Sequence, residues 1–142
     1  MNGYLFDTNV LLDIATADPA WLGWSEKQFR LAAAQGPILI NPIIYAELAP
    51  AFASVHDLDR WLDPAVFQRL PLPYAAGWLA AQAFLNYRRN GGNRFSPLPD
   101  FYIGTHAETE GRTLVTRDHA RYRTYFPKLS IITPESPETT KK

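Results

Sequence analysis

The feature that most constrains the fold is a series of short apolar runs separated by segments with helical periodicity. The first run, Tyr4-Leu5-Phe6, and the second, residues 37–40, are apolar throughout, which is typical of strands buried on both faces. Further runs of strand length follow at residues 66–70, 113–116 and 129–132. Because strands that alternate with helices favour a parallel sheet, the sequence predicts an α/β fold. We expect a three-layer α/β/α sandwich around a central, mostly parallel sheet.

Capping residues mark where several of the helices begin. Ser25, followed by Gln28, has the spacing of a capping box and predicts that the second helix begins there. Asn41 and Pro42 are typical of the N-cap and the first position of the next helix. Ser54 predicts the start of a further short helix. These boundaries place helices between successive strands, as parallel pairing requires.

Two longer helices are predicted in the second half of the chain. The length and alanine content of residues 74–89 favour the first, and the second is expected from near Asp100 to Gly111. We expect four large apolar side chains of the first helix to face the core: Trp78, Leu79, Phe84 and Leu85. The other tryptophans are also expected in the core, because Trp is more often a core residue than a stacking platform for bases.

Length and composition predict one globular domain. The chain has 142 residues, 46% of them apolar and 13% aromatic, which excludes a disordered chain. We expect a single domain over residues 1–134 and a flexible tail over residues 135–142, which are rich in Pro, Glu, Thr and Lys. No apolar run is long enough to cross a membrane and no basic leader precedes the first strand, so we expect a cytoplasmic protein. The absence of cysteine excludes thiol catalysis and thiolate metal sites.

Charge is balanced overall but divided unevenly along the chain. Residues 1–70 contain four basic and eight acidic residues, whereas residues 71–142 contain ten basic and six acidic residues. An acidic half and a basic half in one domain suit a metal site beside a surface that binds phosphate.

Asp7 stands directly after the first predicted strand. A carboxylate at the carboxyl end of a parallel strand lies where ligands bind in open α/β sheets, but it is equally suited to cap the helix that follows. Thr8 and Asn9 are also helix-capping residue types. We expect these two residues to serve the cap and to leave both Asp7 oxygens free for a ligand.

Three further acids occur at comparable positions. Glu47 lies on the helix after the second strand, Asp100 opens a later helix, and Asp118 follows the strand at residues 113–116. Parallel strands bring these positions to one edge of the sheet, where four carboxylates would repel each other without a counter-charge. Because oxygen ligands favour hard ions, the pattern predicts a site for Mg²⁺ or Mn²⁺. Such an ion activates water and offsets the negative charge of a phosphodiester.

The acids occur in a pattern that resembles the PIN-domain ribonucleases, specifically the VapC-type toxins of toxin–antitoxin pairs. The resemblance runs from Tyr4 to about Pro134. Its motifs, in chain order, are Asp7-Thr8-Asn9, Glu47 within residues 43–48, Asp100 within residues 98–107, and Leu114-Val115-Thr116-Arg117-Asp118. The resemblance implies that Asp7, Glu47, Asp100 and Asp118 form an acidic metal site, with Asn9 and Thr116 as polar supports.

The resemblance also implies an activity and partners. The activity is Mg²⁺- or Mn²⁺-dependent hydrolysis of RNA, with Asp7 and Asp100 as direct metal ligands and with Glu47 and Asp118 binding a second ion or orienting the attacking water. The implied partners are a VapB-like antitoxin, whose C-terminal segment covers the site, and a second copy of the chain in a homodimer. The alternative is a non-catalytic PIN-like module that binds RNA or protein, which the loss of an acid would favour.

Basic residues in the second half are candidates for binding RNA phosphates. Three of them, Arg88, Arg89 and Arg94, flank the loop around Gly91-Gly92, and Arg117 adjoins Asp118. Arginines at a helix end are as often simply solvated. No histidine lies in a motif that supports an acid–base role, and we expect His106 to be a core or rim residue.

Overall fold

The computed structural model describes residues 3–91 and 98–134, and these residues form one parallel sheet with helices on both faces. The strands are β1 (Tyr4–Phe6), β2 (Ile38–Ile40), β3 (Phe67–Arg69), β4 (Thr113–Val115) and β5 (Ile131–Ile132). They lie in the order β3-β2-β1-β4-β5, and every pair is parallel. The predicted α/β fold and its parallel sheet are therefore confirmed.

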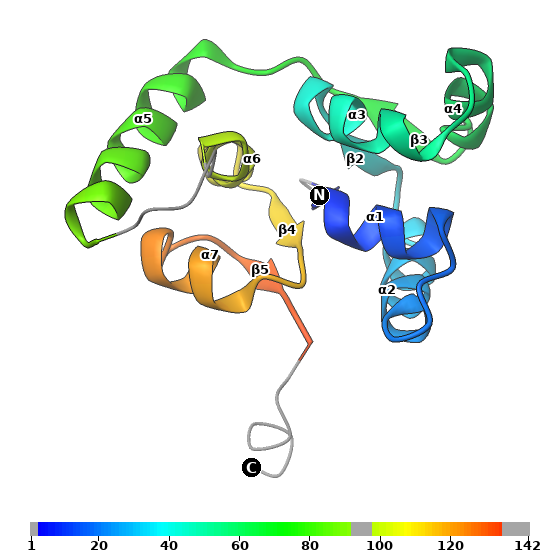
Figure 1. Cartoon of the computed structure of the whole chain (residues 1–142), viewed down its shortest axis with the longest axis horizontal. Helices are drawn as coiled ribbons and strands as arrows, with labels where there is room; N and C mark the ends of the chain where they lie inside the picture. Colours follow the sequence, from blue (N-terminus) through cyan, green and yellow to red (C-terminus); the bar gives the residue numbers. More distant parts are fainter. Residues whose placement is uncertain (1–2, 92–97, 135–142) are drawn as a thin grey trace, which may run out of the picture.

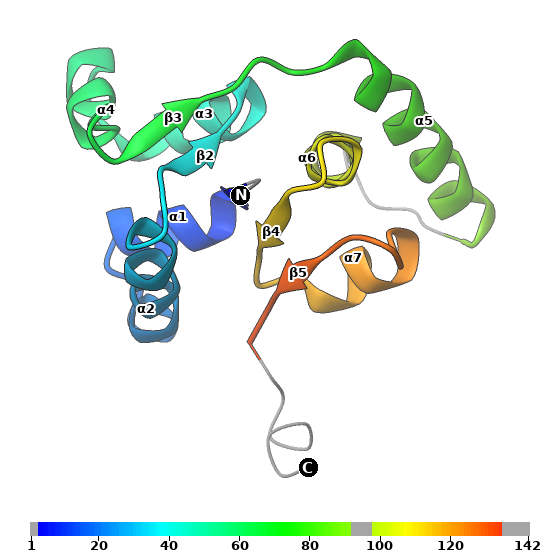
Figure 2. The ribbon, with the colours of Figure 1, turned by 180° about the vertical axis from the view of Figure 1, so that it is seen from behind.

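The helices form the two outer layers of the sandwich. They are α1 (Thr8–Ala15), α2 (Leu22–Ala33), α3 (Pro42–Leu48), α4 (Val55–Trp61), α5 (Tyr74–Arg89), α6 (Leu98–Thr109) and α7 (His119–Tyr125), with a 3₁₀ turn η1 (Ala49–Ala51) after α3. Figures 1 and 2 show α1 and α2 on one side of the sheet and α5, α6 and α7 on the other. Strand β1 is central, so residues that follow it lie in the middle of the carboxyl edge.

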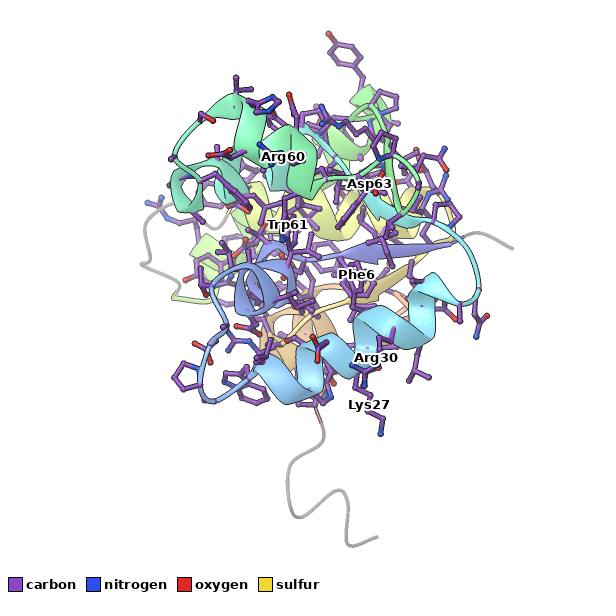
Figure 3. The ribbon with its side chains drawn as sticks, turned by 90° about the vertical axis from the view of Figure 1, so that its right-hand side faces the viewer. Phe6, Lys27, Arg30, Arg60, Trp61 and Asp63 are labelled. Atoms are coloured by element: carbon purple, nitrogen blue, oxygen red, sulfur yellow. The ribbon has the colours of Figure 1, made fainter. Side chains whose placement is uncertain are left out.

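The core consists of the buried side chains of the central strands β1, β2 and β4 and of an aromatic cluster on each side of the sheet. On the α2 side, the ring of Phe6 lies 5.9 Å from that of Phe29, which in turn contacts Phe67. Figure 3 views this side, with Lys27 and Arg30 on the outer surface of α2 and Phe6 above the helix, toward the sheet. On the other side, the Phe101 ring contacts three rings, those of Tyr87, Tyr125 and Phe126. Burial of both clusters fixes the helices on the sheet.

The helix caps after β2 and η1 lie where the sequence predicts them. The Asn41 side chain accepts a hydrogen bond from the Ile44 N–H at 3.0 Å, and Pro42 occupies the first helical position. Ser54 accepts from the Asp57 N–H at 3.1 Å. Both caps satisfy backbone donors that an uncapped helix leaves without partners.

The prediction that a helix begins at Ser25 is wrong. Helix α2 begins three residues earlier, at Leu22, and the Asp18 carboxylate accepts hydrogen bonds from the N–H groups just before it, those of Ala20 and Trp21. Ser25 is fully buried, and its hydroxyl donates to Asp13 Oδ2 at 2.6 Å. The buried Asp13 carboxylate thus takes the serine hydroxyl that local sequence assigns to a cap.

Helix α5 has the predicted bounds but faces the core with a different side. Trp78, Leu79 and Leu85 are 71%, 45% and 46% exposed, so only Phe84 of the four expected core residues packs against the core. The buried face consists of Ala76, Ala80 and Ala83. Small residues are needed there because α5 and α6 pack closely: the Thr105 hydroxyl donates to the Ala76 carbonyl at 2.8 Å. The remaining tryptophans, Trp21, Trp24 and Trp61, are half-buried.

Two further expectations concern the C-terminal tail and membrane-spanning segments. The predicted tail, residues 135–142, lies outside the described residues. Within the parts that are described, no helix combines the length and apolar character needed to cross a bilayer.

Gly104 on α6 provides a test of the close packing between α6 and α7. A Cβ at this position would lie 2.9 Å from Phe126 and 3.0 Å from Tyr122, both buried rings. We expect Gly104→Ala to lower the free energy of unfolding by roughly 1–3 kcal/mol, as overpacked cores do, although alanine is the better helix former. Urea unfolding measures the change.

The matched control is Gly23→Ala on α2, where an added Cβ would meet nothing within 4 Å. This substitution should leave stability unchanged or raise it slightly. Equal effects of the two substitutions would contradict the packing described for α6 and α7.

Candidate active site

An open pocket of about 390 Å³ lies at the carboxyl edge of the sheet. Its lining consists of Asp7, Thr8, Asn9, Leu12, Glu47, Asp100 and Asp118. The acids come from four separate elements: the end of β1, α3, α6 and the start of α7. The structure therefore brings together all four acids that the sequence singles out.

Asp7 is the most buried of the four acids, with 5% of its surface exposed. Its backbone N–H donates to the Val115 carbonyl at 2.9 Å, which extends the β1–β4 pairing by one residue. Its Oδ1 accepts from the Thr8 N–H at 2.8 Å, and its Oδ2 accepts from the Thr116 hydroxyl at 2.7 Å. Two neighbouring strands thus fix the position and the orientation of one carboxylate.

Our expectation that Thr8 and Asn9 serve the helix cap is wrong. Asp7 itself is the N-cap of α1, and each of its oxygens already accepts one hydrogen bond. The reason is that the helix begins at Thr8, immediately after the acid. A carboxylate oxygen accepts more than one hydrogen bond, so both oxygens keep a lone pair that can face the pocket.

Thr116 connects two of the acids. It is fully buried after β4, and its hydroxyl both donates to Asp7 Oδ2 and accepts from the Asp118 N–H at 3.1 Å. Asn9 has a related position, because its Oδ1 accepts from the Arg117 N–H at 3.4 Å. Both polar residues that the sequence singles out as supports therefore hold the segment that carries Asp118.

Glu47 reaches the pocket from α3. Its Oε1 accepts a hydrogen bond from the Thr8 hydroxyl at 2.5 Å. The start of α3 is fixed by Asn41, whose side-chain amide lies 3.0 Å from Nδ1 of the fully buried His106. Burial lowers the pKa of His106, so its ring is neutral at pH 7. The Nε2 atom of His106 lies 3.1 Å from Glu110 Oε1, but the two atoms are not aligned for a hydrogen bond. His106 is therefore a core residue and not a catalytic one.

Asp100 and Asp118 share one cation, the guanidinium of Arg121. Nη1 of Arg121 contacts Asp100 Oδ2 and lies 3.3 Å from Asp118 Oδ2. Asp118 also caps α7, because its Oδ1 accepts from the Arg121 N–H at 3.3 Å. Tyr122, which is fully buried, donates its hydroxyl to the Asp100 carbonyl at 3.0 Å.

Burial and mutual repulsion alter the acidity of the two most enclosed acids. Burial raises the pKa of Asp7 to about 7, and the charges of Asp100 and Glu47 act in the same direction against the hydrogen bonds from Thr116 and Thr8. Burial also raises the pKa of Asp100 to about 6, although Arg121 opposes the change. These shifts indicate a pocket with more negative charge than it can stabilise alone.

The pocket has the chemistry of a divalent metal site. The charged groups that line the pocket are all carboxylates, and Mg²⁺ and Mn²⁺ prefer such oxygen ligands. The Arg121 guanidinium lies against Asp100, where it offsets part of the negative charge. With the side chains as they stand in the described residues, no three acidic or histidine groups surround a common ion position. Thr8 holds Glu47 and Arg121 holds Asp100, so an ion bound by three or more of these acids would need their side chains to rearrange.

Arg117, one of the predicted RNA-binding residues, makes structural contacts. Its Nε and Nη2 lie 2.9 Å and 3.1 Å from the two oxygens of Asp13, which is 3% exposed. Its guanidinium also lies 5.0 Å from the Trp21 ring. Asp13 was not predicted to be important, although a charged residue between Leu12 and Ile14 in an apolar helix is a signal for a buried ion pair.

Arg88 and Arg89, two of the other predicted RNA-binding residues, do not line the pocket. Arg88 and Arg89 are exposed at the end of α5. The Arg88 guanidinium lies 5.9 Å from the centre of the Phe84 ring, and that of Arg89 donates a hydrogen bond to the Asn86 side chain. Arg94 lies outside the described residues. A role for these arginines in RNA binding stays a prediction.

The raised pKa of Asp7 predicts how stability depends on pH. An acid whose folded-state pKa exceeds the unfolded value of 3.8 keeps its proton longer in the folded state, so stability falls as pH rises from about 4 to about 7. At high pH, each unit by which the pKa in the folded state exceeds the pKa in the unfolded state lowers the free energy of unfolding by about 1.4 kcal/mol. With EDTA present, we expect Asp7→Asn to be more stable than the wild type at pH 8 and to lose the advantage near pH 4. Urea unfolding at both pH values tests this, and equal stability at pH 8 would contradict it.

The Asp13–Arg117 pair predicts a strong effect of a single charge. Asp13→Asn leaves the Arg117 cation partly buried without its counter-charge, which should lower the free energy of unfolding by roughly 3 kcal/mol. The matched control is Glu26→Gln, which removes the same charge from an exposed pair with Arg30 and should have little effect. Similar unfolding midpoints for the two variants would show that the pair is not stabilising.

Comparison with solved structures identifies proteins of the same fold. The chain superposes with a TM-score of 0.69 and 19% identity on a chain of VapBC2 from Rickettsia felis bound to a DNA fragment from their promoter, over 93% of this chain and 98% of that one. A chain of DNA-bound VapBC from Salmonella typhimurium gives 0.68 and 20% over 94% and 98%. VapBC-1 from nontypeable Haemophilus influenzae gives 0.69 and 16% over 92% and 96%.

The sequence itself matches a family model over most of its length. No curated protein sequence matches the chain. The model of the PIN domain matches residues 4–127, a span that includes β1 through α7 and all four pocket acids. The expected family is thus confirmed, and the chain belongs to the PIN domain family.

Proposed function

We propose that this protein is a divalent-metal-dependent endoribonuclease of the VapC toxin type. The observation that carries the proposal is the convergence of four carboxylates from four elements on one pocket at the carboxyl edge of the sheet. Family membership supports a nuclease activity, because the acids occupy the motifs that resemble those of PIN ribonucleases.

The bound ion would be Mg²⁺ or Mn²⁺, held by Asp7 and Asp100, and it would supply a polarised water and positive charge beside the scissile phosphate. Asp7 is suited to this role because Thr8 and Thr116 fix its orientation before any ligand binds. Glu47 and Asp118 line the same pocket and are suited to accept a proton from water or to hold a second ion. Neither role requires a histidine.

Hydrolysis in this site would proceed by attack of water on phosphorus in line with the leaving oxygen. The bond between the water oxygen and phosphorus forms, the bond between phosphorus and the 3′-oxygen breaks, and a water proton ends on that oxygen. The products are a 5′-phosphate and a 3′-hydroxyl. The RNA 2′-hydroxyl takes no part, which agrees with a pocket of carboxylates instead of a histidine pair.

The proposal includes a protein partner. The similar structures include VapBC assemblies and a toxin–antitoxin complex from Klebsiella pneumoniae, which supports a VapB-like antitoxin for this chain. A C-terminal antitoxin segment would cover the open pocket and exclude RNA. We further propose that the protein is a homodimer and acts in the cytoplasm, where RNA and antitoxin are present together.

The catalytic proposal is tested with purified protein and total RNA. Cleavage should require Mg²⁺ or Mn²⁺ and stop with EDTA. It should fall by roughly a hundredfold or more in Asp7→Asn or Asp100→Asn, because replacing even a residue that only orients a metal ligand typically costs roughly 10- to 100-fold. Glu26→Gln, an exposed acid on α2, is the control and should cleave at the wild-type rate. Cleavage that is indifferent to EDTA and to both substitutions would refute the metal mechanism, whereas binding of RNA without any cleavage would favour a non-catalytic binding module.

The role of the basic end of α5 is tested by the salt dependence of RNA binding. In an Asp7→Asn background that does not cleave, replacement of Arg88 and Arg89 by Ala should reduce the slope of log K against log salt by about 1.4, because each phosphate contact on a single strand contributes about 0.7. The control replaces Lys27 and Arg30, two bases on the outer side of α2 (Figure 3). Equal slopes for both double variants would exclude α5 from the RNA-binding surface.

A further inference from the structure

The Arg121 guanidinium stands between two acids of the pocket. Arg121 lies on the first turn of α7, and its Nη1 contacts Asp100 Oδ2 from α6 and lies 3.3 Å from Asp118 Oδ2. Its side chain is 17% exposed, compared with 32% for Asp100 and 35% for Asp118. The arginine is therefore more enclosed than either of the carboxylates that it joins.

Several contacts hold Arg121 in this position. Its guanidinium lies 6.0 Å from the centre of the buried Phe101 ring, the residue after Asp100. Its backbone N–H donates to Asp118 Oδ1, so the residue is fixed at both ends to the same acid. An arginine at the i+3 position of its own helix cap, with a second acid supplied by another helix, is a defined ion-pair site and not a solvated surface residue.

This arrangement conflicts with metal binding. Asp100 Oδ2 accepts a charge-assisted hydrogen bond from Arg121, and the same oxygen is a candidate ligand for the metal. A divalent ion among these oxygens would also be repelled by a guanidinium a few ångströms away. Arginine remains charged at all ordinary pH values, so it cannot avoid the conflict by losing a proton.

We propose that Arg121 is a built-in competitor of the metal ion. In the metal-free protein it holds Asp100 and Asp118 together and offsets their repulsion, and it releases Asp100 when Mg²⁺ or Mn²⁺ binds. Arg121 is thus a positioning residue that sets the metal affinity of the site. The inference rests on the proposed metal-dependent function, but it concerns the affinity for metal and not the cleavage of RNA.

The test is titration of Mn²⁺ into Arg121→Met by isothermal calorimetry, with free Mn²⁺ measured by electron paramagnetic resonance. The control is Arg123→Met, which removes an equal charge from an exposed position on the same helix. We expect Arg121→Met to bind Mn²⁺ roughly tenfold more tightly than the wild type, which corresponds to about 1.4 kcal/mol. The control should remain within about twofold of the wild type, because an exposed charge is screened.

A second measurement separates competition from a general loss of structure. With EDTA present, Arg121→Met should have a lower Tm than Arg123→Met, because Asp100 and Asp118 then repel each other without a counter-charge. Saturating Mn²⁺ should remove this difference. A Tm that stays low in saturating Mn²⁺ would mean that Arg121 is a permanent structural bridge, and it would overturn the proposal.

Arg121→Lys gives a variant that keeps the charge and the fold but has no planar fork to hold two carboxylates. Its Mn²⁺ affinity should lie between those of the wild type and Arg121→Met. In the wild type, the Nε–Hε resonance of Arg121 should shift on addition of Mg²⁺, whereas that of Arg123 should not. Wild-type affinity in Arg121→Lys together with an unmoved Arg121 resonance would overturn the proposal.

The outcomes distinguish this inference from the proposed function. If the wild type binds Mn²⁺ through Asp7 but Arg121→Met binds it no more tightly, the inference alone fails. If neither protein binds Mn²⁺, both the inference and the metal-dependent function fail. Measurable binding by the wild type together with tighter binding by Arg121→Met would support both the inference and the metal-dependent function.

Discussion

The burial of the Asp7 carboxylate at the end of the central strand is the constraint on which the site depends. A carboxylate with 5% exposure is costly unless hydrogen bonds or a cation stabilise its charge. Hydrogen bonds from the Thr8 N–H and the Thr116 hydroxyl do so only in part, because the pKa of Asp7 still lies near 7. The fold thus orients the Asp7 carboxylate but stabilises its negative charge only in part, and a metal ion would supply the missing positive charge.

The strand order explains why distant segments meet at this carboxylate. Strand β1 is central and β4 lies beside it, so Asp7 and Thr116 end neighbouring strands although they are 109 positions apart. Thr116 then fixes Asp118, and Thr8 fixes Glu47. The Asp100 carboxylate is instead held by Arg121, and its backbone carbonyl accepts from the Tyr122 hydroxyl. Under the proposed competition, metal binding would act on the contact between Arg121 and Asp100 and leave the hydrogen bonds of Asp7 in place.

The sequence predicts the features that local pattern determines. Strand runs, the Asn41 cap and the acids at strand ends follow from spacing and from the geometry of parallel sheets. Prediction from the sequence fails where a tertiary contact outweighs a local preference. The Ser25 hydroxyl donates to Asp13 and does not cap a helix. The close contact between α5 and α6 buries the alanine face of α5, whereas Trp78 was expected to face the core. Arg121 was missed for a related reason, since only the fold brings its partner Asp100 within reach from 21 positions away.

The proposed function requires that Asp7 and its neighbouring acids form a divalent metal site. Crystals soaked in Mn²⁺ would test it most directly through anomalous difference density. One strong peak is expected within ligand distance of an Asp7 oxygen and an Asp100 oxygen, with Arg121 turned away from Asp100. Crystals that bind Mn²⁺ only at other positions, with the Arg121 bridge intact and Asp7 free of metal, would contradict it.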